Sequence, residues 1–323
     1  MATPIPAARG GSTLRAFVYY FLSVFSFSVV DAATKLLRGE PDTVTRWIPG
    51  NFDLGTWQVI FLTRIPPLCV ALLLTAQATG SPFRLKTRFW KTHVLRGVLV
   101  LATTFTFYAG LRYLPLADTI VIAFAAPIFV TALSGPLLGE KVGWRRWSAV
   151  GVGFAGVIVA VRPDTSIGIG TILILCSAVA YALTLITLRP LSGKESTHNI
   201  VFYSTAFGFV VAAVPALLDW KPIGLEATVI IVVQGMASAC GQFAMIRAFR
   251  IGEASMLAPL EFTALIWAAA CGLAFWLQFP TLEVLAGAAL IIGANVYLAQ
   301  REARLAERKP ELPPVPEHAG VPE

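Results

Sequence analysis

The chain has 323 residues, of which 56% are hydrophobic and 13% are charged, and the charged fraction is about half that of a typical soluble domain. This composition excludes a fold that has water as its main solvent. The formal charge of +7 does not indicate nucleic-acid binding, because the basic residues lie at the ends of apolar segments. The four cysteines lie within apolar segments and show no disulfide or metal-ligand spacing.

Ten mostly apolar segments follow one another along the chain, and all but the fifth, which is the shortest, are long enough to cross the ~30 Å hydrocarbon core of a bilayer as a helix. We expect these helices at residues 16–33, 57–75, 94–111, 117–138, 147–161, 167–188, 200–218, 225–246, 254–277 and 282–299. The segments are continuously apolar and do not alternate, which argues against the strands of a membrane barrel. The predicted fold class is therefore an all-α polytopic membrane protein.

Two polar segments flank the apolar ones. Residues 1–15 form a short leader, and residues 303–323 form a Pro- and Glu-rich tail that lacks the apolar content to fold alone. Arg9 and Arg15 precede the first apolar segment, as basic residues do in a signal peptide. Cleavage there would leave nine segments, so we expect the first segment to be retained.

Lysine and arginine are distributed unequally between alternate loops. With the N-terminus inside, the inner segments hold 17 of these residues and the outer loops hold six. This excess follows the positive-inside rule, so we expect both termini to be cytoplasmic and the protein to lie in the inner (plasma) membrane. Anionic lipid of the inner leaflet is the expected partner of these charges.

The last five segments loosely repeat the first five. Residues 21–39 align with residues 175–193 at an offset of 154, Val59–Phe61 with Ile200–Phe202 at 141, and Ala117 with Ala254 at 137. The offset shrinks mainly across the polar loop at residues 40–52. A repeat with an odd number of spans must lie inverted relative to its copy, an arrangement that places a central site between two gates. We predict inverted five-helix repeats at residues 16–162 and 163–302.

Motifs near the ends of the two halves resemble those of a known family. They are Leu137-Leu138-Gly139-Glu140-Lys141, the glycine-rich Gly151–Gly156, Ala258-Pro259-Leu260-Glu261-Phe262-Thr263, and Gly287–Ile292. In this order they resemble the EamA-like branch of the drug/metabolite transporter superfamily. The resemblance implies a ten-helix fold with a central cavity and the transport of metabolites, and relatives include amino-acid exporters and importers of S-adenosylmethionine and riboflavin. The family's second Gly-Glu is replaced here by Leu277-Gln278.

Ionisable side chains at membrane depth are costly and usually face a bundle interior or a watery cavity. Glu261 follows Pro259 in the ninth segment, and we consider it either a solute- or proton-binding carboxylate or a buried acid bonded to a neighbouring helix. Arg64 precedes Pro66 and Pro67, and it either holds a solute carboxylate or acts as a structural strut to Glu261 or Asp31. Asp31 and Lys35 are one turn apart, as in an ion pair or an outer gate, although a solvated helix end is the commoner reading.

Aromatic and amide side chains complete the candidate binding or coupling residues. They are Tyr108, Tyr181, Trp267, Gln234 and Gln242. The two glutamines are eight residues apart and share a helix face. Packing is the alternative role for each aromatic residue. We expect small-residue positions at Gly151, Ala155, Gly287 and Ala288 to serve close helix packing.

The predicted function is secondary transport of small organic metabolites (amino-acid-like, nucleoside-like, flavin or S-adenosylmethionine class) by alternating access, with proton coupling as an option. A receptor or assembly protein is the alternative. An enzyme is disfavoured because His93, His198 and His318 lie outside the apolar segments or at their edges. We expect a small-molecule substrate and membrane lipid as partners, with a homodimer as an option. We expect no nucleic acid, cofactor or metal.

Overall fold

The computed structural model describes residues 10–39, 52–80, 87–138, 144–161, 168–187, 197–251, 257 and 260–307. Within these ranges the regular secondary structure is helical and contains no strand. The helices are α1 (Gly10–Arg38), α2 (Thr56–Thr63), α3 (Ile65–Thr79), α4 (Trp90–Gly110), α5 (Leu116–Ala123), α6 (Ala126–Leu138), α7 (Trp144–Val161), α8 (Ile169–Ile186), α9 (Thr197–Leu218), α10 (Leu225–Ile251), α12 (Thr263–Trp276) and α13 (Leu282–Glu307). Most of the predicted loop at 40–52, residues 1–9 of the leader and the tail beyond residue 307 lie outside the described residues.

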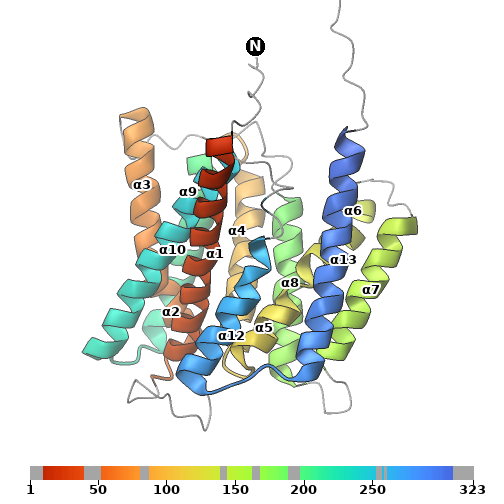
Figure 1. Cartoon of the computed structure of the whole chain (residues 1–323). Coiled ribbons are helices and arrows are strands. Elements are labelled where there is room, and N and C mark those ends of the chain that lie inside the picture. Colours follow the sequence, from red (N-terminus) through yellow and green to blue (C-terminus); the bar gives the residue numbers. More distant parts are fainter. Residues whose placement is uncertain are drawn as a thin grey trace, which may run out of the picture.

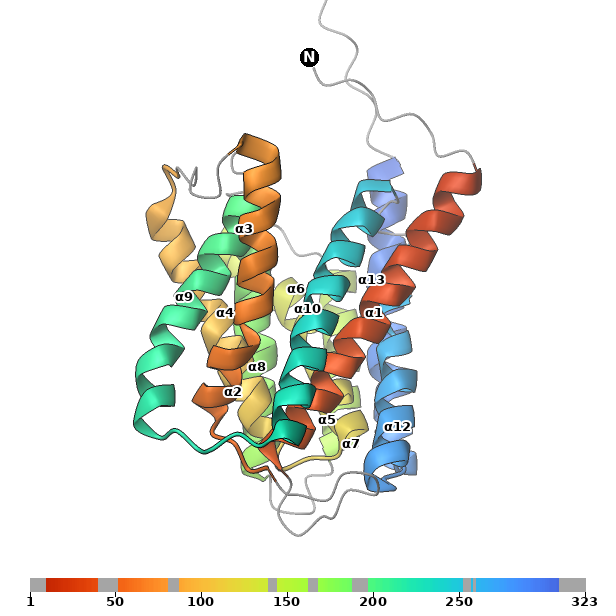
Figure 2. The same ribbon diagram turned by 90° about the vertical axis from the view of Figure 1, so that its left-hand side faces the viewer.

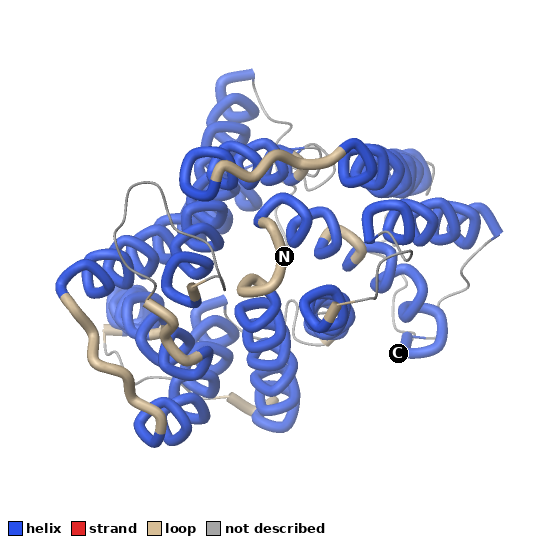
Figure 3. Tube along the Cα trace, turned by 90° about the horizontal axis from the view of Figure 1, so that it is seen from below, coloured by secondary structure: helices blue, strands red, loops and turns tan. Residues whose placement is uncertain are grey.

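The helices lie side by side in a bundle whose long direction is vertical in Figure 1 and Figure 2, and Figure 3 shows the bundle in cross-section. Helix α1 packs along α10, α7 along α13, and α4 along α8. One apolar core joins α5, α6, α7 and α13 around Ile128 and Ile291, and another joins α1, α5 and α12 around Leu116 and Trp276. The bundle is therefore held together by several local cores.

Every predicted apolar segment contains helix among the described residues. Six helical stretches are long and apolar enough to cross a membrane, namely Leu14–Arg38, Thr56–Gln77, Leu116–Ser134, Ile169–Ile186, Asn199–Leu218 and Leu225–Met245. Three shorter apolar helices, Trp147–Val161, Thr263–Trp276 and Leu282–Tyr297, accompany them. The chain is thus an all-helical, multi-pass membrane protein.

Two glycines allow α7 and α13 to approach closely. A Cβ on Gly156 would lie 2.9 Å from the Gly287 carbonyl oxygen, and one on Gly287 would lie 2.6 Å from the Gly156 carbonyl oxygen. The prediction of close packing is thus confirmed for Gly287. It is wrong for Gly151, which has open space around its Cβ position, because α7 is turned so that Gly153 and Gly156 face the neighbouring helices. Ala155 is exposed for the same reason.

Three helices are interrupted near prolines. Arg64 separates α2 from α3 and lies two residues before Pro66, which like Pro67 has no N–H to continue the hydrogen-bond ladder. Residues 124 and 125 separate α5 from α6 in the same way, before Pro127, and a turn at residue 262 precedes α12. Irregular backbone at membrane depth requires other groups to satisfy its carbonyls, and such breaks commonly mark binding sites.

Burial along α1 changes from one end to the other. Near the N-terminal end Leu14 and Val18 are 66% and 58% exposed, whereas residues 32–39 at the other end are all buried. The bundle is therefore closed around the C-terminal end of α1. We call this side the α1 C-terminal face.

Candidate functional site

Arg64 lies at the break between α2 and α3 and points toward α4. Its guanidinium Nη2 donates a 2.6 Å hydrogen bond to Oγ1 of Thr104. Tyr108, one turn further along α4, is close enough to interact electrostatically with this guanidinium. Among the described residues no carboxylate forms an ion pair with Arg64, so the strut to Glu261 or Asp31 is not present. Gly208 of α9 packs beside the guanidinium, since a Cβ built there would lie in ordinary van der Waals contact with Nε, at 3.5 Å.

Gln234 connects α10 to α1 and α4. Its amide Nε2 lies 2.7 Å from Oγ1 of Thr34 and 3.4 Å from the hydroxyl of Tyr108. The Thr34 hydroxyl donates to the carbonyl of Val30, so its oxygen accepts from the Gln234 amide in this arrangement. The other end, Oε1, is buried and has no hydrogen-bond partner in the described part of the chain.

Asp31 lies one turn before Thr34 on α1 and faces the same group of residues. It is half-buried, and its charge interacts with Tyr108 of α4 and Cys271 of α12. Described side chains provide neither an ion pair nor a hydrogen bond to its carboxylate. We call Asp31, Thr34, Arg64, Thr104, Tyr108 and Gln234 the Tyr108 cluster.

Lys35 takes a different role from the predicted ones. Its ammonium donates hydrogen bonds to the carbonyl oxygens of Leu111 and Leu114, at 3.3 Å and 2.5 Å, and lies 5.4 Å from the ring centroid of Trp276. The side chain is completely buried. It therefore satisfies carbonyls at the C-terminal end of α4, where the helix dipole also favours a cation. Between these two described residues the expected Asp31–Lys35 ion pair is absent, and the solvated helix end is wrong.

Glu261 belongs to a second group of polar residues. It is exposed and interacts electrostatically with Tyr20 of α1 and Tyr181 of α8. Arg96 of α4 influences the same tyrosine and donates a 2.7 Å hydrogen bond to the carbonyl of Thr184. Tyr181 is 43% exposed. Glu261 and Tyr181, both predicted binding residues, are thus near each other and exposed, and their role in binding stays a prediction.

The two groups lie at different depths in the bundle. Tyr20 and Asp31 are eleven residues apart on α1, which is about 16 Å along a helix. Arg96 and Tyr108 are twelve residues apart on α4, or about 18 Å. Glu261 thus lies about three helical turns from the Tyr108 cluster, toward the N-terminal end of α1.

Trp267 and Gln242 are outside both groups. Trp267 makes edge contacts with Phe21 and Phe25, at ring-centroid distances of 5.7 Å and 4.8 Å. It lines a cavity of about 550 Å³ whose other walls are also apolar, formed by Phe17, Val18, Phe21, Leu22, Phe25 and Leu260. Gln242 donates to Ser238 of its own helix at 3.3 Å. The shared face of the two glutamines thus does not bring Gln242 into the Tyr108 cluster.

The break between α5 and α6 meets the turn before α12. Phe124 and Phe262, one from each interruption, pack edge to face with their centroids 5.5 Å apart. Asn295 of α13 donates a 3.2 Å hydrogen bond to the carbonyl of Phe124, which stabilises backbone freed by the break. Glu261 is the residue directly before Phe262, so this contact positions it.

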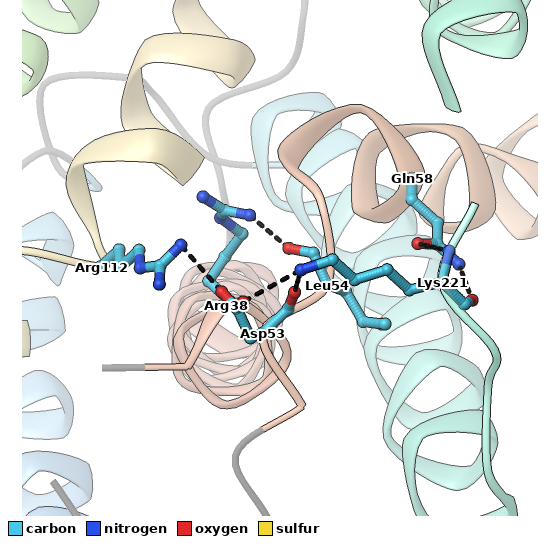
Figure 4. A network of polar contacts seen from close by, with 6 residues as sticks. All are labelled: Arg38, Asp53, Leu54, Gln58, Arg112 and Lys221. Carbon is cyan, nitrogen blue, oxygen red and sulfur yellow. Dashed lines mark hydrogen bonds and ion pairs between the residues drawn. The ribbon is translucent and has the colours of Figure 1, made fainter. Parts of the chain in front are cut away.

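A polar network closes the α1 C-terminal face (Figure 4). Asp53, between α1 and α2, forms ion pairs with Arg112 at 2.8 Å and with Lys221 at 2.9 Å. Gln58 donates to the carbonyl of Lys221 at 2.8 Å, and Arg38 donates to the carbonyl of Leu54. We call these six residues the Asp53 network. It joins α1 and α2 to the loop after α4 and to the loop between α9 and α10.

Electrostatics favour the ionised form of Asp53. Partial burial alone would raise the pKa of its carboxyl, but the hydrogen bond from Lys221 and the charges of Arg112, Lys221 and Arg38 outweigh that effect and hold the pKa below its usual value. The carboxyl is thus ionised at neutral pH. The network is accordingly formed under physiological conditions.

The sequence reasoning missed several of these residues. Thr34 and Thr104 carry no distinctive signal, because a threonine in an apolar helix commonly bonds to its own backbone. A usable signal does exist for the interruptions: Ala126-Pro127 with Thr131-Ala132-Leu133 recurs as Ala258-Pro259 with Thr263-Ala264-Leu265, 132 residues later. This pairing marks the two interruptions that meet at Phe124 and Phe262.

Comparison with known proteins agrees with this architecture. The family model described as EamA-like transporter family matches residues 14–162. An S-adenosylmethionine uptake transporter of Rickettsia felis is 30% identical over 229 residues, which cover 70% of this chain and 78% of the relative. The chain belongs to the EamA-like transporter family. As a member of this family of the drug/metabolite transporter superfamily, it is a small-molecule transporter and not an enzyme.

Other members of the family and a solved structure extend the comparison. A riboflavin transporter of Rhizobium johnstonii is 26% identical over 298 residues, which cover 88% of this chain and 95% of the relative. A solved crystal structure shares the fold with a TM-score of 0.58 at 16% identity and covers 92% of this chain and 99% of its own. The EamA-like assignment therefore rests on sequence similarity over most of the chain, and the solved structure shows that the fold is shared.

Proposed function

We propose that this EamA-like protein is a secondary carrier that moves a small organic metabolite across the inner membrane by alternating access. The observation that supports this most is the meeting of two interrupted helices at Phe124 and Phe262, beside Glu261. Carriers commonly place such breaks, one from each half, at the substrate site near the membrane midplane. The recurring Ala-Pro motifs place the two breaks in corresponding segments of the two halves.

In this proposal ten membrane helices form two inverted repeats, at residues 16–162 and 163–302, with both termini in the cytoplasm. The Asp53 network then lies on the outer side, and the conformation described here is closed to the outside. The exposure of Glu261 and Tyr181 supports access from the opposite, cytoplasmic side. Opening to the outside requires the loop between α9 and α10 to separate from Asp53.

Transport into proteoliposomes tests the carrier function. Purified protein is reconstituted and supplied with radiolabelled S-adenosylmethionine, riboflavin, methionine or another amino acid, with protein-free liposomes as the control. A carrier will accumulate or exchange at least one labelled solute, with saturation at high concentration. Failure to move any member of this panel, in vesicles where the protein is folded and inserted, would favour the receptor or assembly role.

Proton coupling through Glu261 is the finer part of the proposal. A carboxylate exposed to a space within the bundle can bind a proton in one conformation and release it in the other. Glu261→Gln should then abolish uphill uptake under an imposed proton gradient and retain gradient-free exchange. Glu226→Gln, a change of an exposed acid in the first turn of α10, is the matched control. Uphill uptake that persists in Glu261→Gln would exclude the coupling role.

A further inference from the structure

Two opposite charges in the Tyr108 cluster have no ion-pair partner among the described residues. The guanidinium of Arg64 has one hydrogen bond, to Thr104, and no described carboxylate within ion-pair distance. The carboxylate of Asp31 has no described cation or hydrogen-bond donor. Both charges interact electrostatically with Tyr108, so both lie near this residue. Both side chains are half-buried and thus partly accessible.

An unpaired charge at membrane depth is unfavourable by roughly 2.5 to 3.5 kcal/mol on insertion scales. The protein could reduce this cost by pairing Asp31 with Lys35, one turn away, but the Lys35 ammonium is directed to the carbonyls of Leu111 and Leu114. Asp31 and Arg64 are therefore available to a solute. A solute that satisfies both must carry a negative and a positive charge close together.

Gln234 adds an independent observation. Its side chain is completely buried, and its Oε1 has no donor among the described residues, although Nε2 is satisfied by Thr34. A buried acceptor without a donor is unusual in a folded protein. A donor from outside the described part of the chain, such as an ammonium group of a solute, would satisfy this acceptor. An ammonium group has three donors, enough for a carboxylate and an amide oxygen together.

We propose that the Tyr108 cluster binds the α-amino-acid head group of the transported solute. This inference rests on the proposed carrier function and specifies its substrate class. Arg64 receives the carboxylate in a two-pronged contact, for which its planar fork is suited. Asp31 and the Oε1 of Gln234 receive the ammonium. Thr104 orients the guanidinium, and Tyr108 lies between the two charged ends.

The assignment separates the solute classes open to this family. S-adenosylmethionine and free amino acids carry the zwitterionic head group, whereas riboflavin does not. It also separates the head-group site from Glu261, which lies about three turns away along α1 and α4. The remainder of a larger solute extends from the Tyr108 cluster toward Tyr181 and the N-terminal end of α1.

Titration calorimetry of the purified full chain tests the proposal with paired probes. The probes are S-adenosylmethionine, its decarboxylated analogue, 5′-methylthioadenosine, methionine and riboflavin. In the unmodified protein, removing the carboxylate should weaken binding about 10- to 100-fold, as expected for loss of charge-assisted hydrogen bonds. In Arg64→Gln the same removal should change affinity less than about threefold, because the carboxylate no longer has a partner.

Two further variants and a matched control keep the test decisive. Asp31→Asn should weaken binding of every probe that carries the amine and leave the effect of the carboxylate intact. Arg247→Gln removes a guanidinium that lies over the Phe243 ring on α10, outside both polar groups, and should keep the full 10- to 100-fold discrimination. Should Arg64→Gln not fold, Thr104→Val frees the guanidinium from its anchor and should reduce the discrimination by several-fold.

The outcomes distinguish the two proposals. Equal binding of S-adenosylmethionine and its decarboxylated analogue by the unmodified protein would overturn the head-group assignment. The assignment would also be wrong if riboflavin or 5′-methylthioadenosine bound and no probe that carries the head group did. Binding of none of the probes would overturn it as well. Transport of riboflavin into proteoliposomes would keep the carrier function in the first two cases.

Discussion

Asp53 links the loops of the α1 C-terminal face, and its removal should loosen that face by a calculable amount. Asp53→Asn keeps the shape of the side chain and removes the charge from both ion pairs, with Arg112 and with Lys221. The side chains are 30% to 41% exposed, so water screens each pair to about 0.2 to 1 kcal/mol. The two together contribute about 1 kcal/mol, which corresponds to a roughly fivefold change in the ratio of closed to open forms.

Cysteine labelling measures this ratio. Leu37 is completely buried beside the Asp53 network, and Leu37→Cys in a background without the native cysteines reports opening of that face. An impermeant maleimide should label it about five times faster in Asp53→Asn, and at the unchanged rate in Glu226→Gln. Labelling at the same rate with and without Asp53 would refute the role of the network as a closure.

The pH dependence of labelling follows from the lowered pKa of Asp53. Because the carboxyl pKa is lowered in the folded protein, ionised Asp53 stabilises the closed face fully above its pKa in the unfolded chain, ~3.9. This stabilisation is lost only as the pH falls through the lower pKa of the folded protein. The labelling rate, corrected for the reactivity of the thiol, should therefore be constant between about pH 5 and 8. A corrected rate that rises on acidification within this window would show that another group controls the face.

Three other changes test the description of the fold. Lys35→Met leaves two buried carbonyls without their donor, at a cost of about 3 kcal/mol, and should lower the melting temperature in detergent by roughly 6 to 12 °C; a drop of under about 2 °C would contradict its capping role. Leu277 ends α12 with a left-handed φ of 55°, so Leu277→Gly should raise the melting temperature by about 2 to 4 °C, and a decrease would show that its side chain matters more than its backbone. A cysteine in the loop at residues 40–52 should react with an impermeant reagent from outside and one at residues 84–91 should not; the reverse pattern would invert the assigned topology.

The sequence was sufficient for the helices because membrane helices depend on local apolar composition. The doubled proline after Arg64 is likewise a local signal, and the break between α2 and α3 lies at that residue. Leu277 stands where the family has glycine, and the left-handed backbone there is one that glycine adopts without strain. These features share one property, which is that a few neighbouring residues determine them.

The composition of the candidate site was less predictable because its contacts join distant parts of the chain. Gln234 meets Thr34 across 200 residues, and Lys35 meets Leu111 across 76. Spacing on a single helix favoured an Asp31–Lys35 pair and a shared role for Gln234 and Gln242. Neither arrangement is present among the described residues, because helix packing places backbone carbonyls beside Lys35 and because Gln242 donates to a residue of its own helix.

The buried position of Lys35 has a consequence for synthesis of the protein. The two carbonyls that satisfy its ammonium belong to residues 76 and 79 positions later in the chain, so at 5 to 20 residues per second they emerge from the ribosome about 4 to 16 s after Lys35. During that interval α1 carries Asp31 and Lys35 without their final surroundings, and its C-terminal end has to stay near the translocon or the lipid headgroups. Lys35 of α1 therefore acquires its final hydrogen-bond partners only after α4 has been made.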